Sequence, residues 1–150
     1  MEVANETLGV YLAPNGDQTR QISKLTSKAN QFASAIQSGR ISRRDAYHAL
    51  KTTIWKTMEY PLTITSLQKS QWDNIIKNVL LNTLPKTGII RTFPRSLAFV
   101  GNESHGLGYQ HPFILQTIKQ ITIITKFWHW KSTTGGLIRN LWENTVQITG

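Results

Sequence analysis

The fold class is decided by residues 17–39, which read DQTRQISKLTSKANQFASAIQSG. Apolar side chains recur there at intervals of three and four residues, which predicts an amphipathic helix with one buried stripe. The stripe comprises Ile22, Leu25, Ala29, Phe32, Ala33 and Ile36. Asp17 can accept a hydrogen bond from a free N–H at the helix start, and Gly39 is expected to end the helix in a left-handed conformation.

The residues before this helix predict a short strand from Thr7 to Leu12. Turn-forming residues at 14–17 close the strand and lead into the helix. Few residues precede Thr7 that could supply a partner strand, so we expect an exposed strand edge. The chain therefore resembles the tail of a larger protein.

A second helix is expected after Ser42. The pattern of Ser42 and Asp45 is that of a capping box, and Pro61 is expected to stop the helix just after Tyr60. Its expected buried face comprises Ala46, Leu50, Ile54 and Met58.

A third helix is expected to begin near Thr65 or Ser66 and to end at Pro85 and Gly88. Its expected buried face comprises Leu67, Ile75, Ile76, Val79, Leu80 and Leu84.

Residues 89–111 are expected to form a loop with one or two short strands, because short apolar runs alternate there with Pro and Gly. Pro112 suits the first turn of a fourth helix. One face of that helix would carry Ile114, Ile118, Ile121, Ile124 and Trp128. The β-branched residues in 117–125 leave a buried strand as an alternative. Ser132 and the two threonines after it predict the start of a last helix that runs to about residue 147.

Composition limits the partners that the chain could have. Lys and Arg number 17 against 8 Asp and Glu, which gives a net charge of +9 and favours nucleic acid as a partner. A solvated cationic surface is the alternative. Cys is absent, which excludes disulfides and thiolate metal sites. No signal peptide is visible, and polar residues such as Gln116 and Lys119 argue against a membrane span in 112–130.

Candidate nucleic-acid contacts cluster on the first two helices. Arg20, Lys24 and Lys28 recur every four residues and project from one face. On the second helix, Arg44, His48, Lys51 and Trp55 are expected to share a face, and Trp55 could stack on a base. Arg43 is a further basic candidate of this segment. Arg91 and Arg95 are second-rank candidates in the loop. Ordinary solvent-exposed basic faces would give the same pattern.

The order of short motifs along the chain resembles one region of a known family. It is similar to the segment that follows the catalytic palm in reverse transcriptases of non-LTR retrotransposons of protist and fungal type, from about residue 6 to the C-terminus. The motifs are Leu8-Gly9-Val10, Ala13-Pro14-Asn15-Gly16, Ser42-Arg43, Thr52-Thr53-Ile54, Glu59-Tyr60-Pro61-Leu62, Leu84-Pro85-Lys86-Thr87-Gly88-Ile89, Gly106-Leu107-Gly108 and Thr133-Thr134-Gly135.

The resemblance implies a mainly α fold, a thumb-like bundle of about five helices that grips an RNA or RNA–DNA duplex. Residues 1–16 would be the palm-end strand and turn, 17–88 a three-helix thumb-like region, and 89–150 the loop and C-terminal helices of one compact unit. Leu8, Gly9 and Val10 would correspond to the primer grip. The missing palm and fingers are possible further partners.

The resemblance also implies that this chain does not catalyse polymerisation by itself. Polymerases need carboxylates that hold two Mg²⁺ ions, yet the three aspartates, Asp17, Asp45 and Asp73, are scattered along the chain. His105 and His111 match no metal-ligand spacing. We therefore expect no catalytic residue, cofactor, membrane or small-molecule substrate in this chain, since Mg²⁺ would belong to the missing palm. The resemblance also implies an intracellular location, with the nucleus as one candidate compartment.

Two alternatives of other classes remain open. In the first, the chain would be an independent small basic nucleic-acid-binding protein, and in the second a protein-interaction module that meets an acidic partner. Binding to duplex that depends on salt and little on sequence would favour a nucleic-acid role over the interaction module.

Overall fold

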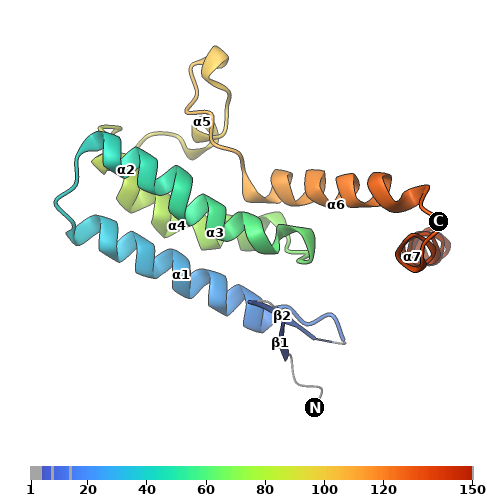
Figure 1. The fold of residues 1–150 in the computed structure, drawn as a ribbon. Coiled ribbons are helices and arrows are strands. Elements are labelled where there is room, and N and C mark those ends of the chain that lie inside the picture. The colour runs from blue at the N-terminus through green and yellow to red at the C-terminus, as the bar shows by residue number, and fades with distance from the viewer. Residues whose placement is uncertain (1–4, 8, 14, 150) are drawn as a thin grey trace.

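The computed structural model describes the backbone of residues 5–7, 9–13 and 15–149, and their side chains except at 141 and 144–149. The described chain is mainly helical, as the sequence predicts, and its small antiparallel sheet lies near the N-terminus (Figure 1). The elements in order are β1 Asn5–Thr7, β2 Val10–Leu12, α1 Thr19–Ser38, α2 Arg43–Ala49, η1 Leu50–Ile54, α3 Trp55–Glu59, η2 Tyr60–Thr63, α4 Lys69–Lys86, α5 Arg95–Ala98, η3 Asn102–Ser104, α6 Pro112–Trp128 and α7 Thr133–Thr149.

Helix α1, the continuous rod from α2 to η2, and α4 form the bundle, and α6 extends away from it to α7 (Figure 1). The core lies where these helices meet and is centred on Trp72, which is fully buried. The expected stripes are confirmed, because Leu25, Ala29, Leu50 and Ile76 all contribute to this core. The indole of Trp72, which the periodicity alone does not single out, fills the largest volume in it.

The strand prediction is corrected by a hairpin. Strand β1 pairs antiparallel with β2, with Thr7 opposite Val10, so the turn falls inside the segment expected to be one strand. Gly9 has φ +81, and this left-handed backbone favours glycine. Val10 is only 1% exposed and faces inward. Leu8, the first residue of the expected primer grip, lies outside the described residues.

Helix α1 begins as expected but ends differently. The Asp17 carboxylate accepts a hydrogen bond of 3.0 Å from the Thr19 N–H. Gly39 was expected to be left-handed, and this is wrong, because its φ is −70 and its ψ is 140. Its role is steric instead. A Cβ at Gly39 would lie 2.9 Å from the carbonyl oxygen of Ala35, closer than side-chain carbons approach backbone oxygens.

The rod from α2 to η2 contains a π-helical turn at η1. Ser42 caps the rod by accepting a hydrogen bond of 3.1 Å from Asp45 N–H, as the sequence predicts. The expected buried face is spaced by four residues throughout. Such a stripe drifts about 40° per step around an α-helix, and a wider π turn absorbs that drift. All of its members are buried: Ala46, Leu50, Ile54 and Met58.

Two helix boundaries in the bundle differ from the prediction. Pro61 does not stop the rod after Tyr60, because a 3₁₀ turn accepts Pro near its start and continues to Thr63. Helix α4 begins at Lys69 rather than near Thr65 or Ser66, since Gln68 and Gln71 form the capping box. The segment at 65–67 forms neither helix nor strand and receives hydrogen bonds from α6 instead.

The described residues of 89–111 contain no strand, which corrects the prediction of one or two. A turn of helix, α5, and the 3₁₀ turn η3 occupy the segment. Backbone hydrogen bonds fold the chain back on α5: Tyr109 N–H donates to Ala98 O at 3.0 Å, and Gly108 N–H to Val100 O at 2.8 Å. These bonds satisfy the backbone groups that a strand would have paired with a neighbour.

Helix α6 resolves the choice left open at 117–125, because this segment is helical. The buried Gln116 helps to fasten α6 to the bundle, and Gln120 adds a link by donating to Thr65 O at 2.7 Å. Gln116 Nε2 donates to Leu67 O at 3.0 Å, and Gln116 Oε1 accepts from Trp72 Nε1 at 3.0 Å. The expected apolar face of α6 points away from the core, and Ile114, Ile118 and Ile121 are 56%, 53% and 54% exposed.

Candidate nucleic-acid interface

The row of cations on α1 is partly used inside the protein. Lys24 donates to the carbonyl oxygen of Gly9 at 2.7 Å, pairs with the Glu6 carboxylate, and lies over the Tyr11 ring. This bond from Lys24 holds the pKa of Glu6 below its usual value. Because its ammonium group already contacts the hairpin, Lys24 is a poor phosphate ligand. Its two expected companions, Arg20 and Lys28, are exposed at the surface.

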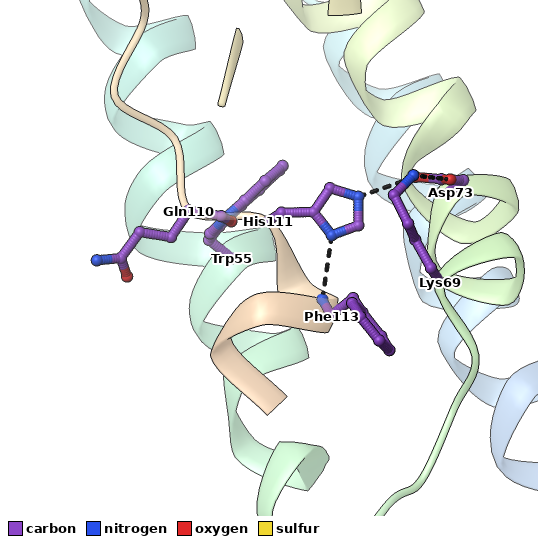
Figure 2. A network of polar contacts seen from close by, with 6 residues as sticks. All are labelled: Trp55, Lys69, Asp73, Gln110, His111 and Phe113. Carbon is purple, nitrogen blue, oxygen red and sulfur yellow. Dashed lines mark hydrogen bonds and ion pairs between the residues drawn. The ribbon is translucent and has the colours of Figure 1, made fainter. Parts of the chain in front are cut away.

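Trp55 is not placed to stack on a base, which corrects the expected shared face. Its Nε1–H donates to the carbonyl oxygen of Gln110 at 2.8 Å, and its ring lies 5.7 Å from that of Tyr109 (Figure 2). The π turn explains the orientation. One extra residue in the turn rotates everything after it by roughly 100°, away from the face that carries Arg44. Trp55 holds the loop that leads into α6.

A separate group of cations lies together at one end of the bundle. We call Arg40, Arg43, Arg44, Lys86 and Arg91 the basic end. Two contacts bring the segments together: Lys86 Nζ donates to Gly39 O at 3.1 Å, and the Arg43 side chain passes 3.3 Å from the Cβ position of Gly88. In Figure 1 this is where the α1–α2 connection meets the end of α4.

The guanidinium groups of the basic end are available to a partner. Arg40, Arg43, Arg44 and Arg91 are exposed, and within the described part of the chain none makes a hydrogen bond or an ion pair. The neighbouring carboxylate, Asp45, accepts from the Ser42 hydroxyl at 2.7 Å. Lys51, another expected contact, is exposed farther along the rod, beside the pocket under Trp55. The structure thus brings Arg43 beside Gly88, which Arg91 follows closely in the chain, and places Arg20 and Lys28 in the first half of α1, away from this end.

Arg95 lies in a different place. It lines a cavity of about 440 Å³ between α4, α5 and the start of α6, together with Asp73 and His111. His111 Nδ1 accepts the Phe113 N–H at 3.2 Å, so Nε2 carries the proton and donates to Asp73 Oδ1 at 2.8 Å (Figure 2). The other carboxylate oxygen accepts from Lys69 at 2.7 Å.

The Asp73 carboxylate is ionised in this network. Burial raises its pKa, but the hydrogen bonds from Lys69 and His111 outweigh that effect, so the pKa lies below its ordinary value. In the sequence Asp73 and His111 look isolated, because 38 positions separate them. A histidine directly before a helix-starting proline is the signal that could have shown its capping role.

No three His, Asp or Glu side chains are grouped around a possible metal position among the residues described here. Within the same ranges, none of the helices combines the length and the apolarity that a membrane crossing requires. Comparisons of the chain with family models, with curated proteins and with solved structures gave no match. The residues of the basic end therefore carry the functional argument by themselves.

Proposed function

We propose that this chain binds a nucleic-acid duplex through its basic end, as the non-catalytic, thumb-like part of a retrotransposon reverse transcriptase. The observation that carries the proposal is the group of unpaired guanidinium groups where α1, α2 and α4 meet. Guanidinium groups bind phosphate oxygens with two parallel hydrogen bonds, and the bonding does not depend on the base sequence. A role on retrotransposon nucleic acid implies an intracellular protein, with the nucleus as one compartment.

Helix stability does not account for these arginines. Arg43 and Arg44 occupy the first turn of α2, where the positive end of the helix dipole disfavours a cation by roughly 0.3–1 kcal/mol. Asp45 in the same turn is the type of residue that the dipole favours, whereas the two arginines beside it are not. A polyanion bound across the basic end would reverse the cost, because both side chains could then face phosphates.

The exposed isoleucines of α6 support the assignment to a larger polymerase. Ile114, Ile118 and Ile121 form an apolar face more than half exposed on one side of the helix. Faces of this kind are usually covered by another domain or protein. In the proposed setting, the palm or fingers would cover it, and Mg²⁺ and the catalytic carboxylates would be supplied there rather than by this chain.

The test compares two double variants that remove the same charge. Arg43→Gln/Arg44→Gln changes the basic end, whereas Lys126→Gln/Lys131→Gln removes two exposed cations at the far end of α6. Binding to an RNA–DNA hybrid is measured by fluorescence anisotropy over a range of salt concentrations. The basic-end variant should lose affinity and lower the salt slope by about 0.7–0.9 per phosphate contact removed. The control should bind like the wild type.

Equal losses in both variants would refute a localised interface and leave only non-specific attraction. An acidic protein that binds more tightly than the hybrid, through the same arginines, would favour the alternative of a protein-interaction module. Tight duplex binding combined with a monomer that stays soluble would favour an independent nucleic-acid-binding protein over a polymerase part.

A further inference from the structure

The cavity beside α5 has the make-up of a small-molecule site. It lies on the outer face of α4, closed by α5 on one side and by the start of α6 on the other. Its volume, about 440 Å³, falls within the range of about 300–1,000 Å³ that is typical of ligand pockets. No local pattern of residues reveals this cavity, because its walls come from three segments far apart in the chain.

The interior of the cavity is apolar and aromatic. Ile76 and Leu80 of α4 form its floor, and both are almost fully buried. Phe99 and Phe113 face it from α5's end and from α6, each half-buried. Two phenyl rings with branched aliphatic chains favour a flat apolar group, since such a group can pack against a ring.

One wall of the cavity is polar but already satisfied. Asp73 holds both Lys69 and His111, and His111 in turn caps α6, so each of these side chains has its partner (Figure 2). The network fixes the wall of the cavity and compensates the carboxylate charge. It leaves no lone acidic group that would repel an anion.

Two further cations border the cavity without a partner. Lys77 and Arg95 are exposed and make no hydrogen bond or ion pair within the described chain. Three cations and one carboxylate line the cavity in all, which leaves a surplus of two positive charges. The chemistry that matches this lining is an apolar ring with an acidic group attached to it.

We propose that this cavity binds an organic anion, with its ring between Phe99 and Phe113 and its carboxylate or phosphate at Lys77 and Arg95. Two sources share this chemistry, an aromatic carboxylate and a nucleoside monophosphate. The site does not depend on nucleic-acid binding by the basic end, because Lys77 lies nine residues before Lys86 on α4, roughly 13 Å along the helix. In this proposal Arg95 belongs to the cavity and is not a duplex contact.

The test is a titration of the full chain, followed by two-dimensional amide NMR, with 2-naphthoate, its neutral counterpart 2-naphthamide, and adenosine monophosphate. 2-Naphthoate should shift amides at residues 76–80 and 95–99. It should bind about tenfold more tightly than 2-naphthamide, because a charge-assisted hydrogen bond is worth roughly a factor of ten. Adenosine monophosphate shifting the same amides would identify a nucleotide as the source, and no shift with it would identify a carboxylate.

Two variants separate the cavity from general attraction to a basic protein. Lys77→Gln/Arg95→Gln should reduce the naphthoate affinity about tenfold and leave the naphthamide affinity unchanged, whereas Lys126→Gln/Lys131→Gln should change neither. Ser96→Trp places a bulky ring at the exposed rim and should abolish both. Equal binding of acid and amide, or shifts confined to α6 and α7, would overturn the proposal. Neither result depends on the duplex assay.

Discussion

Gln116 is a central link between α6 and the bundle, beside Gln120, which donates to Thr65 O, and Lys119, which pairs with Glu59. Gln116 is 4% exposed, and its amide joins three groups of the bundle: Oε1 accepts from Leu67 N–H at 3.2 Å and from Trp72 Nε1–H at 3.0 Å, while Nε2 donates to Leu67 O at 3.0 Å. Gln116→Met keeps the length of the side chain and removes every one of these bonds. Two donors and one acceptor would then be buried without partners.

The magnitude follows from those three groups. Each unpaired buried group costs about 1–3 kcal/mol, and part of the cost is recovered by relaxation and by the more favourable burial of Met, so we expect a loss of about 3–5 kcal/mol. That is a large share of the roughly 5–15 kcal/mol of a typical domain. Urea unfolding, followed by far-ultraviolet circular dichroism, measures the loss as a lower midpoint.

The matched control is Gln31→Met, which makes the same substitution at an exposed position of α1. It should change the free energy of unfolding by no more than about 0.5 kcal/mol. A loss below about 1 kcal/mol for Gln116→Met, or a loss equal to that of Gln31→Met, would show that the three bonds do not hold α6 in place.

Three further predictions concern the bundle and its stability. Gly88→Ala should cost about 1 kcal/mol or more in thermal unfolding, because φ there is +90 and favours glycine, and a neutral effect would contradict this backbone. Ser42→Ala should cost about 1 kcal/mol in the same assay through loss of the cap, whereas Ser42→Asp should retain stability. The hydrogen bond from Lys119, followed by that from Lys56, holds the pKa of Glu59 below its ordinary value of 4.5. A lowered carboxyl pKa adds stability that is present above pH 4.5 and is lost as the pH falls through the lower value. Glu59→Gln should therefore weaken the dependence of the free energy of unfolding on pH below pH 4.5. An unchanged dependence on pH in that range would contradict this.

The helices were predictable because their signals are local. The stripe of α1, the Ser42 cap and the start of α6 at Pro112 each depend on residues within one or two turns of each other. The exact ends were less predictable, because Thr65 and Leu67 accept hydrogen bonds from α6 across about fifty positions of the chain.

The candidate interface was predictable in part. The clustering of Arg43 and Arg44 is visible in the sequence, but their meeting with Lys86 depends on how α1 and α4 pack. Lys24 bonds to the hairpin and Trp55 bonds to the loop before α6, so neither is available to a partner. Charge and helical periodicity could not predict this, because both contacts are tertiary hydrogen bonds. The cavity of Lys77 and Arg95 has no local signature.

The π-helical turn at η1 contains one residue more than an α-helical turn would need. Three exposed residues lie in this turn, Lys51, Thr52 and Thr53. The Thr52 hydroxyl donates a hydrogen bond of 2.7 Å to the carbonyl oxygen of His48. Removing any one of these three residues would convert the turn to ordinary α-helix. The core spacing would change from four, four and four to four, three and four, which reduces the drift on an α-helix to about 20° per seven residues. We therefore expect deletion of Thr52 to be tolerated, with thermal unfolding near that of the wild type, because the buried side chains on either side of the turn stay in phase.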